Sequence, residues 1–465
     1  MKIVVLNGSP KNDLSITLQY IKYIQKVLPR HTIDIINVCR MINDIKNDRS
    51  IFSGEMEKVR GCDGILWSSP VYYFLIPAQY KRFIELIWEE DKDGLFRGKY
   101  AASLTTSVHF YDHAAHNYLR AISDDLGMRY VGSFSADMYS LLKESEREKL
   151  ISFAEDYFEA IERRRITTRS FYPLLRHDYR YTSSSTVETV DTADKKIVMV
   201  TDVTANDGNL AMMIQFIKDT YSGNMEIVDL NKMNFAEGCI GCLSCGFDNR
   251  CIFEGADIFN SVFDTKLKNA DIIIYAGSIR DRFLSSQWKL FFDRSFFTNH
   301  IPSLAGKQMG FVISGPLHQL SNLREILEAY SECMHSHAVD FVTDEDGDPA
   351  VIDALLRNLA SRLIKYAQNR YIKPFTFLSI GGRKILRDEI WGRLRFIFQA
   401  DHRFYKKHRM YDYPQKDFTS RFRNIMMITL TKIPPIKRMF VRRIREEMVR
   451  PHRKIVDGYF ATRRY

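Results

Sequence analysis

The strongest constraint on the fold is an internal repeat, because the same order of apolar and helical segments occurs twice. In the first copy, residues 1–165, helical patterns lie at about 15–27, 77–89, 113–126 and 143–164. Short apolar runs that precede or follow them lie at 2–7, 32–38, 64–68, 100–107 and 129–135. Such runs are typical of strands in a parallel sheet covered by helices on both faces. We therefore predict a doubly wound α/β domain with five strands.

The second copy begins near Lys196 and has apolar runs at 196–203, 225–230, 271–276, 307–314 and 338–343. The motif AQYKRF at 78–83 recurs 208 residues later as SQWKLF, whereas the two first strands are 194 residues apart. The second copy is thus 14 residues longer between its first and third strands. We predict two tandem domains, at 1–165 and 195–370, joined by a Ser/Thr-rich linker at 166–194.

The longer stretch of the second copy contains a compact group of cysteines. Cys239, Cys242, Cys245 and Cys251 follow the spacing C-x2-C-x2-C-x5-C, and the other three cysteines are scattered. Two-residue gaps let four thiolates converge on an iron–sulfur cluster or a structural zinc ion. Disulfides are less favoured, because we see no secretory signal and such runs more often bind metal inside cells. We predict a metal centre, with a thiol loop that binds nothing as the alternative.

Positive charge is concentrated near the C-terminus. The chain has a net charge of +10, yet residues 371–465 hold 24 Lys and Arg against 8 Asp and Glu, interleaved with apolar residues at helical spacing. We predict a basic, mainly helical C-terminal extension over 371–465. It either packs on the body with a solvated basic face, or meets an acidic protein such as an electron carrier, or an anionic membrane. No nucleic-acid motif is present, so we expect no nucleic-acid partner. No apolar run is long enough to span a bilayer.

Three loops of the first copy follow strands that end at one edge of the predicted sheet, where open α/β sheets bind ligands. The first, NGSPKNDLSIT, leads into a helix, whose free N–H groups suit a phosphate together with Ser9, Lys11, Ser15 and Thr17. An ordinary capped turn is the alternative. The second loop carries flat groups suited to an isoalloxazine ring: Pro70, Val71, Tyr72, Tyr73 and Phe74. The third offers polar groups: Thr105, Thr106 and His109.

The motifs GSPK…S-x-T and SPVYYFLIPAQYKRFIE resemble the phosphate loop and the flavin-ring loop of the flavodoxin-like NADPH-dependent FMN reductase family. The resemblance covers about 1–165 and, more weakly, 195–345. The cysteine run is similar to that of iron–sulfur flavoproteins, which hold FMN and a [4Fe-4S] cluster. The resemblance implies FMN on the loop residues named above together with Pro10, and a cluster on the four cysteines.

The second copy departs from the flavin pattern. Asp202-Val203-Thr204 replaces Gly8-Ser9-Pro10, and an acid there is expected to repel phosphate. A charged stretch, Ser278-Ile279-Arg280-Asp281-Arg282, replaces the aromatic loop. The resemblance implies that relatives with one domain per chain form dimers in which the cluster of one subunit serves the flavin of its neighbour. We therefore expect an intrachain pseudo-dimer with one flavin and one cluster, and further oligomerisation stays open.

These features predict an iron–sulfur flavoprotein oxidoreductase that passes electrons between NAD(P)H or a ferredoxin-like carrier, FMN and the cluster. No G-x-G-x-x-G fingerprint follows a strand, so a nicotinamide would have to stack on the flavin itself. No side chain demands an acid–base role, so we predict no catalytic residue. One alternative is an NAD(P)H-dependent FMN or quinone reductase with a zinc or empty cysteine loop. Another is a non-catalytic assembly or membrane-docking protein. We expect a cytoplasmic location, with peripheral membrane association as an alternative.

Overall fold

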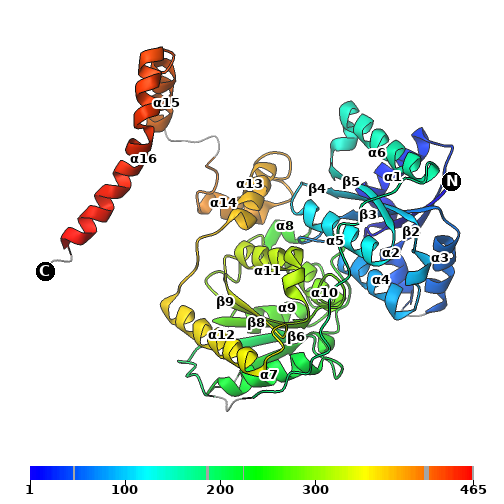
Figure 1. Ribbon diagram of the computed structural model, residues 1–465, viewed down its shortest axis with the longest axis horizontal. Helices are drawn as coiled ribbons and strands as arrows, with labels where there is room; N and C mark the ends of the chain where they lie inside the picture. Colours follow the sequence, from blue (N-terminus) through cyan, green and yellow to red (C-terminus); the bar gives the residue numbers. More distant parts are fainter. Residues whose placement is uncertain (46–47, 185–187, 224, 413–417, 463–465) are drawn as a thin grey trace. The chain divides into compact units, whose positions relative to one another are not determined.

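The computed structural model contains two five-stranded parallel sheets (Figure 1). The structure describes residues 1–465 except 46–47, 185–187, 224, 413–417 and 463–465. The strand orders are β2-β1-β3-β4-β5 and β10-β9-β8-β6-β7. When the five strands of each domain are numbered along the chain, both sheets have the order 2-1-3-4-5. This is the flavodoxin-like order of a doubly wound fold. The predicted fold class is confirmed.

The first domain matches its expected pattern closely. Its strands are β1 (Lys2–Asn7), β2 (Thr32–Asn37), β3 (Gly64–Pro70), β4 (Tyr100–Ser107) and β5 (Arg129–Asp137). Its helices are α1 (Ile16–Val27), α2 (Val38–Ile45), α3 (Ser50–Arg60), α4 (Ala78–Glu89), α5 (Asp112–Asp125) and α6 (Glu144–Glu162). The apolar sides of α1 and α6 cover one face of the sheet, and those of α2 to α5 cover the other. Sequence analysis missed α2 and α3, and Val38 begins α2 rather than ending a strand.

The second domain repeats this plan. Its strands are β6 (Ile197–Thr201), β7 (Met225–Asp229), β8 (Ile272–Ser278), β9 (Gln308–Ser314) and β10 (His337–Thr343). Its helices are α7 (Gly208–Thr220), α8 (Cys245–Asp248), α9 (Phe259–Val262), α10 (Ser286–Arg294), α11 (Ser321–Cys333) and α12 (Pro349–Asn369). Helices α7 and α12 cover one face. The other face continues into the core of the first domain, so one apolar core joins the two sheets.

The two domains meet through α4 and α10, which exchange helix caps. The N–H of Ala78, at the start of α4, donates to Asp293 of α10 at 2.8 Å. In turn, the N–H of Ser286, at the start of α10, donates to Glu85 of α4 at 2.6 Å. The first N–H groups of a helix have no partner within the helix, so each carboxylate satisfies one of them in the other domain. Both pairs of equivalent residues are 208 apart, so the interface has approximate twofold symmetry.

Each of these two helices also sends a buried lysine across the interface. Lys81 Nζ lies 2.7 Å from Glu85 and 3.0 Å from Asp281, which follows β8 in the second domain. The equivalent Lys289 pairs with Asp293 and donates to the carbonyl of Tyr72, which follows β3 in the first domain, at 2.9 Å. Each lysine therefore fixes the loop that follows the third strand of the other domain.

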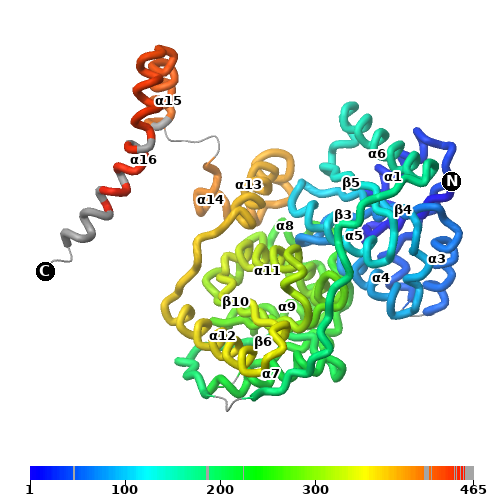
Figure 2. The backbone as a smooth tube through the Cα atoms, in the orientation of Figure 1, coloured from blue at the N-terminus to red at the C-terminus, as the bar shows by residue number. Residues whose placement is uncertain are grey.

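The C-terminal extension consists of two parts. One compact unit spans Met1–Lys407 and includes α13 (Phe377–Trp391) and α14 (Gln399–Lys407), so residues 371–407 pack with the two sheets. A separate unit, His408–Tyr465, contains α15 (Phe418–Leu430) and α16 (Pro434–Thr462). Figure 2 shows α15 folded back along the first part of α16. Among the described residues, no helix is both long and apolar enough to cross a membrane.

Replacing Lys81 with Met should destabilise the protein strongly. The substitution leaves Asp281 buried without its cation and leaves Glu85 with Arg82 alone, and breaking such a buried ion pair typically costs about 3 to 5 kcal/mol. Lys58→Met is the matched control, because Lys58 forms a more exposed ion pair with Glu55 on α3. Urea denaturation followed by circular dichroism should show a large decrease in the free energy of unfolding for Lys81→Met and a small one for Lys58→Met. Equal decreases would show that the buried lysine contributes no more to stability than the exposed one.

Stability should fall in mild acid because of His116. This side chain is buried between α5 and β4, where it contacts Ser103 Oγ at 2.7 Å and Thr105 Oγ1 at 2.9 Å. Burial lowers the pKa of His116 from 6.5 to about 4. The folded state therefore binds this proton less tightly than the unfolded state, and stability is lost as the pH falls from about 6.5 towards 4.

A His116→Gln variant, which cannot titrate, should lose less stability than the wild type between pH 7 and pH 4.5. The expected difference is roughly 2 to 3 kcal/mol, from the size of the pKa change. Urea unfolding at the two pH values measures it. Identical pH dependence in the two proteins would show that His116 is not the group responsible.

Candidate functional site

The predicted ligand loops of the first domain and the cysteine loop of the second line one cavity of about 270 Å³. This is close to the lower end of the range for small-molecule pockets. Its predicted lining residues are Ser9, Lys11, Ser15, Thr17, Pro70, Val71, Tyr72, Tyr73, Thr106, Cys239, Cys242, Cys245 and Cys251. The pairing of α4 with α10 thus brings together two groups of residues that sequence analysis identified separately.

The turn after β1 is built to leave the start of α1 open to a ligand. Ser15 caps α1, with its Oγ accepting from the N–H of Leu18 at 3.3 Å. A Cβ on Gly8 would lie 1.9 Å from the ring of Tyr80, so only glycine lets the turn pass this close to α4. The hydroxyls of Ser9 and Thr17 and the Lys11 side chain line the cavity beside the helix N-terminus. This donor set fits a phosphate group.

The loop after β3 is a tight turn that presents Tyr72 to the cavity. Tyr72 and Leu75 exchange backbone hydrogen bonds of 2.7 and 3.1 Å. Tyr73 and Phe74 lie between them and have positive φ angles of 41° and 73°, which residues other than glycine rarely adopt. Such strain persists only where the surrounding structure enforces it, and Lys289 holds the Tyr72 carbonyl.

Four predicted ligand residues do not line the cavity: Pro10, Phe74, Thr105 and His109. Phe74 is buried in the core against Phe110 and Tyr111. Successive side chains of a strand point to opposite faces, so Thr106 faces the cavity while Thr105 turns to His116 on α5. His109 is exposed and pairs with Asp112 at 3.0 Å.

The cysteine loop lies directly against the flavin-type loops. Gly241 has a φ of +63°, and a Cβ there would lie 2.0 Å from the Tyr72 hydroxyl and 3.1 Å from Cε of Lys11. Only glycine therefore permits this approach. Buried Arg294 anchors the loop, because it donates to the carbonyl of Glu237 at 2.9 Å and pairs with Asp257 at 2.7 Å.

The four thiols share one electrostatic environment. Burial raises the pKa of Cys239 to about 12 and raises the pKa of Cys245 still further, and charge on the neighbouring cysteines would add to both shifts. The Cys239 and Cys245 thiols therefore keep their protons at neutral pH, and a metal would have to displace those protons. All seven cysteines are free of disulfides. Within the described part of the chain, no three His, Cys, Asp or Glu side chains are arranged to hold one metal ion, so the metal centre stays a prediction.

Sequence analysis missed a buried relay that ends on Cys245. Nε2 of His300, which is only 2% exposed, lies 3.1 Å from the Cys245 sulfur, and its Nδ1 lies 2.7 Å from Asp401. If Nδ1–H of His300 donates a hydrogen bond to Asp401, Nε2 carries no proton and accepts a hydrogen bond from the Cys245 thiol. Asp401 comes from α14, and Leu386, Leu394 and Phe398 of the same C-terminal segment line the cavity. These residues are far apart in sequence, so no local pattern could have grouped them.

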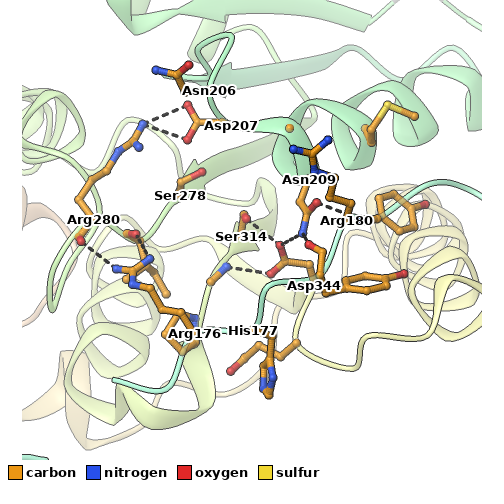
Figure 3. A pocket seen from close by; sticks show the side chains of 18 of the residues that line it. Arg176, His177, Arg180, Asn206, Asp207, Asn209, Ser278, Arg280, Ser314 and Asp344 are labelled. Carbon is orange, nitrogen blue, oxygen red and sulfur yellow. Dashed lines mark hydrogen bonds and ion pairs between the residues drawn. The ribbon is translucent and has the colours of Figure 1, made fainter. Parts of the chain in front are cut away.

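The corresponding edge of the second domain carries the linker instead (Figure 3). Asn209 of α7 bonds to the backbone of Tyr179 and Tyr181 at 2.8 and 2.9 Å, and it also donates to Asp344. The Tyr181 hydroxyl is anchored on Asp353. A polar cavity of about 820 Å³ remains beside the linker. We expected Asp202 to repel a phosphate here, but its carboxylate turns inward and accepts from Ser285 and from Trp288 Nε1.

The fold and the loops define the first domain as a flavodoxin-like domain with a flavin-type ligand edge. Residues 1–139 match the family model of NADPH-dependent FMN reductase, so the first domain is similar to that family. The match implies flavin-dependent oxidoreductase chemistry for the first domain, and FMN is the cofactor that the family implies. The match ends before the second domain and its cysteines.

Several solved structures of reductases are similar over about a third of this chain. An NADH:FMN oxidoreductase, EMOB, is 18% identical over 34% of this chain and 89% of its own, with a TM-score of 0.29. FerB, an NAD(P)H:(acceptor) oxidoreductase from Paracoccus denitrificans, is 18% identical over 35% and 97%, with a TM-score of 0.28. An NAD(P)H:quinone oxidoreductase from Methanothermobacter marburgensis is 16% identical over 35% and 97%, with a TM-score of 0.26. No curated protein matches the chain.

A Lys11→Glu variant should bind FMN less tightly, because a carboxylate would face the phosphate in place of an ammonium. The expected loss of affinity is roughly tenfold or more, the usual effect of a hydrogen bond to a charged group. Lys22→Glu is the matched control, since Lys22 is exposed on the same helix and does not line the cavity. Fluorescence titration of the apoprotein with FMN measures both; equal affinities would argue against phosphate binding beside Lys11.

Proposed function

We propose that this chain is an iron–sulfur flavoprotein oxidoreductase that holds FMN in its first domain and a [4Fe-4S] cluster on Cys239, Cys242, Cys245 and Cys251 of its second. The observation that carries the proposal is the shared cavity, in which four thiols lie beside the family's flavin loops. A flavin exchanges electrons in pairs and a cluster exchanges them singly, so the two groups together would connect two-electron and one-electron chemistry.

The chain's own residues would bind, separate and enclose the two groups. Ser9, Lys11, Ser15 and Thr17 would hold the FMN phosphate, and the Tyr72 loop would support the ring. The contact of Gly241 with Tyr72 supports a short path between the two sites. Phe296, Phe297 and Phe398 line the same cavity and would exclude water from it.

The His300–Asp401 pair supports thiolate binding at Cys245. His300 lies within hydrogen-bond distance of the Cys245 sulfur, and Asp401 orients its ring. A positively charged imidazole there would donate a hydrogen bond to a sulfur that has lost its proton. Hydrogen bonds to cluster sulfurs are among the factors that set a cluster's reduction potential.

One flavin per chain is the stoichiometry that we propose. The linker occupies part of the ligand edge of the second domain, where Asn209 binds the backbone of Tyr179 and Tyr181. The charged stretch Ser278–Arg282 replaces the aromatic loop there, and its Arg280 pairs with Asp207 at 3.0 Å. NAD(P)H, the reductant that the family implies, would reach the flavin of the first domain directly, and a ferredoxin-like carrier is the other donor that we consider.

The second candidate is an NAD(P)H-dependent FMN or quinone reductase whose cysteine loop is empty or binds zinc. The family match favours it, because that match ends at residue 139 and needs no cysteine. Iron and acid-labile sulfide distinguish it from the first proposal.

Protein purified without oxygen should contain about one FMN, four iron and four acid-labile sulfide per chain, the composition of one flavin and one [4Fe-4S] cluster. Two FMN per chain would contradict the division between the domains. Flavin without iron would favour the simple reductase.

A Cys245→Ala variant should lose the cluster and its broad visible absorption while keeping FMN, because the cluster needs four thiolates and the phosphate turn lies in the other domain. Ser244→Ala is the matched control in the same loop. Iron, sulfide and flavin assays on the two variants provide the measurement. Loss of FMN together with iron in Cys245→Ala, but not in the control, would argue against separate sites.

A further inference from the structure

The C-terminal unit, His408–Tyr465, accounts for the entire net charge of the chain. It holds 15 Lys and Arg against 5 Asp and Glu, a net charge of +10. Residues 1–407 contain 52 basic and 52 acidic residues, so the enzyme body has no net charge. A charge separation of this size points to an acidic or anionic partner for the C-terminal unit alone.

The same unit exposes large apolar side chains in rows. On α15, Phe418, Phe422 and Ile425 are 76%, 72% and 65% exposed and lie on one face, because they are four and three residues apart. On α16, Met448 and Ile455 are 68% and 73% exposed and are seven residues apart. A water-soluble surface rarely gathers so many exposed apolar side chains, and such patches usually mark a binding surface.

Basic side chains flank these apolar rows. Arg421 and Arg423 alternate with the apolar residues of α15. Lys437, Arg442 and Arg443 are exposed on the first turns of α16. Long cationic side chains can extend their charged ends into a lipid headgroup layer while their methylene stems stay near the apolar side chains. Basic helices with an apolar face are typical of segments that lie in the surface of an anionic bilayer.

The lengths of the helices favour lying on a membrane over crossing it. Helix α15 has 13 residues and is therefore about 20 Å long, well short of a hydrocarbon core of about 30 Å. Helix α16 has 29 residues and would be long enough, but it carries several charged residues along its length. A nucleic-acid partner would use the charge and leave exposed Phe, Ile and Met side chains without a function.

We propose that α15 and α16 form a docking hairpin that binds the surface of an anionic lipid bilayer, with its apolar rows among the acyl chains and its basic side chains at the headgroups. The hairpin would hold a body without net charge at the membrane. Burial of the apolar side chains and attraction of the basic side chains to anionic headgroups both contribute to the free energy of binding. This proposal is independent of whether the cysteines bind a cluster.

The test is co-sedimentation of the full-length holoprotein with lipid vesicles. We expect binding to phosphatidylcholine vesicles that contain about one third phosphatidylglycerol, weak binding to pure phosphatidylcholine, and weaker binding as salt rises from about 0.1 M to about 0.5 M. A Phe418→Ser, Phe422→Ser double variant should lower the vesicle partition coefficient about tenfold or more. An Arg442→Gln, Arg443→Gln variant should lower it on anionic vesicles only.

Phe377→Ser is the matched control, because Phe377 is equally exposed but lies on α13, outside the hairpin. Unchanged flavin content and circular dichroism would show that each variant is folded. Equal vesicle binding by the double variant and the control would overturn the proposal. So would tighter binding to duplex DNA than to anionic vesicles, or a dimer of this chain that the Phe variant dissociates in the absence of any vesicle binding.

Discussion

The exchange of caps and lysines between α4 and α10 determines the rest of the architecture. Burying Lys81 and Lys289 is costly unless each meets its carboxylates at close range, so the two helices can pack in few ways. Because each lysine also holds the loop after the third strand of the other domain, the interface sets both the relation of the two sheets and the shape of their ligand edges. The meeting of the cysteine loop with the flavin loops follows from it.

Interface and site share residues at α10, which explains why they are coupled. Asp293 caps α4, pairs with Lys289 and lines the cavity, and burial raises its pKa to about 6. Its neighbour Arg294 anchors the cysteine loop. The two copies have diverged around this shared element. One keeps the open turn at α1, whereas the other holds the cysteines and has its own ligand edge partly filled by the linker.

The C-terminal extension is divided between two structural units. Residues 371–407 belong to the same compact unit as the two sheets, where Asp401 of α14 contributes to the relay on Cys245 and Phe398, just before α14, lines the cavity. The unit beyond Lys407 carries the net charge. The basic stretch 371–465 therefore contains two segments in different environments. Residues 371–407 are partly buried against the rest of their unit, and the segment from His408 onward is exposed and amphipathic.

Local patterns in the sequence were enough to predict the strands, the doubly wound fold class, the three loops and the group of four cysteines, because hydrophobic periodicity and residue spacing act over short distances. They were not enough for Thr105 or Phe74, which the pleat of β4 and a strained turn direct away from the cavity. Only tertiary packing decided that Gly241 touches Tyr72 and that His300 and Asp401 reach Cys245. Those contacts join residues from different domains and helices, and their positions depend on how α4 meets α10 and how α14 closes over the loop.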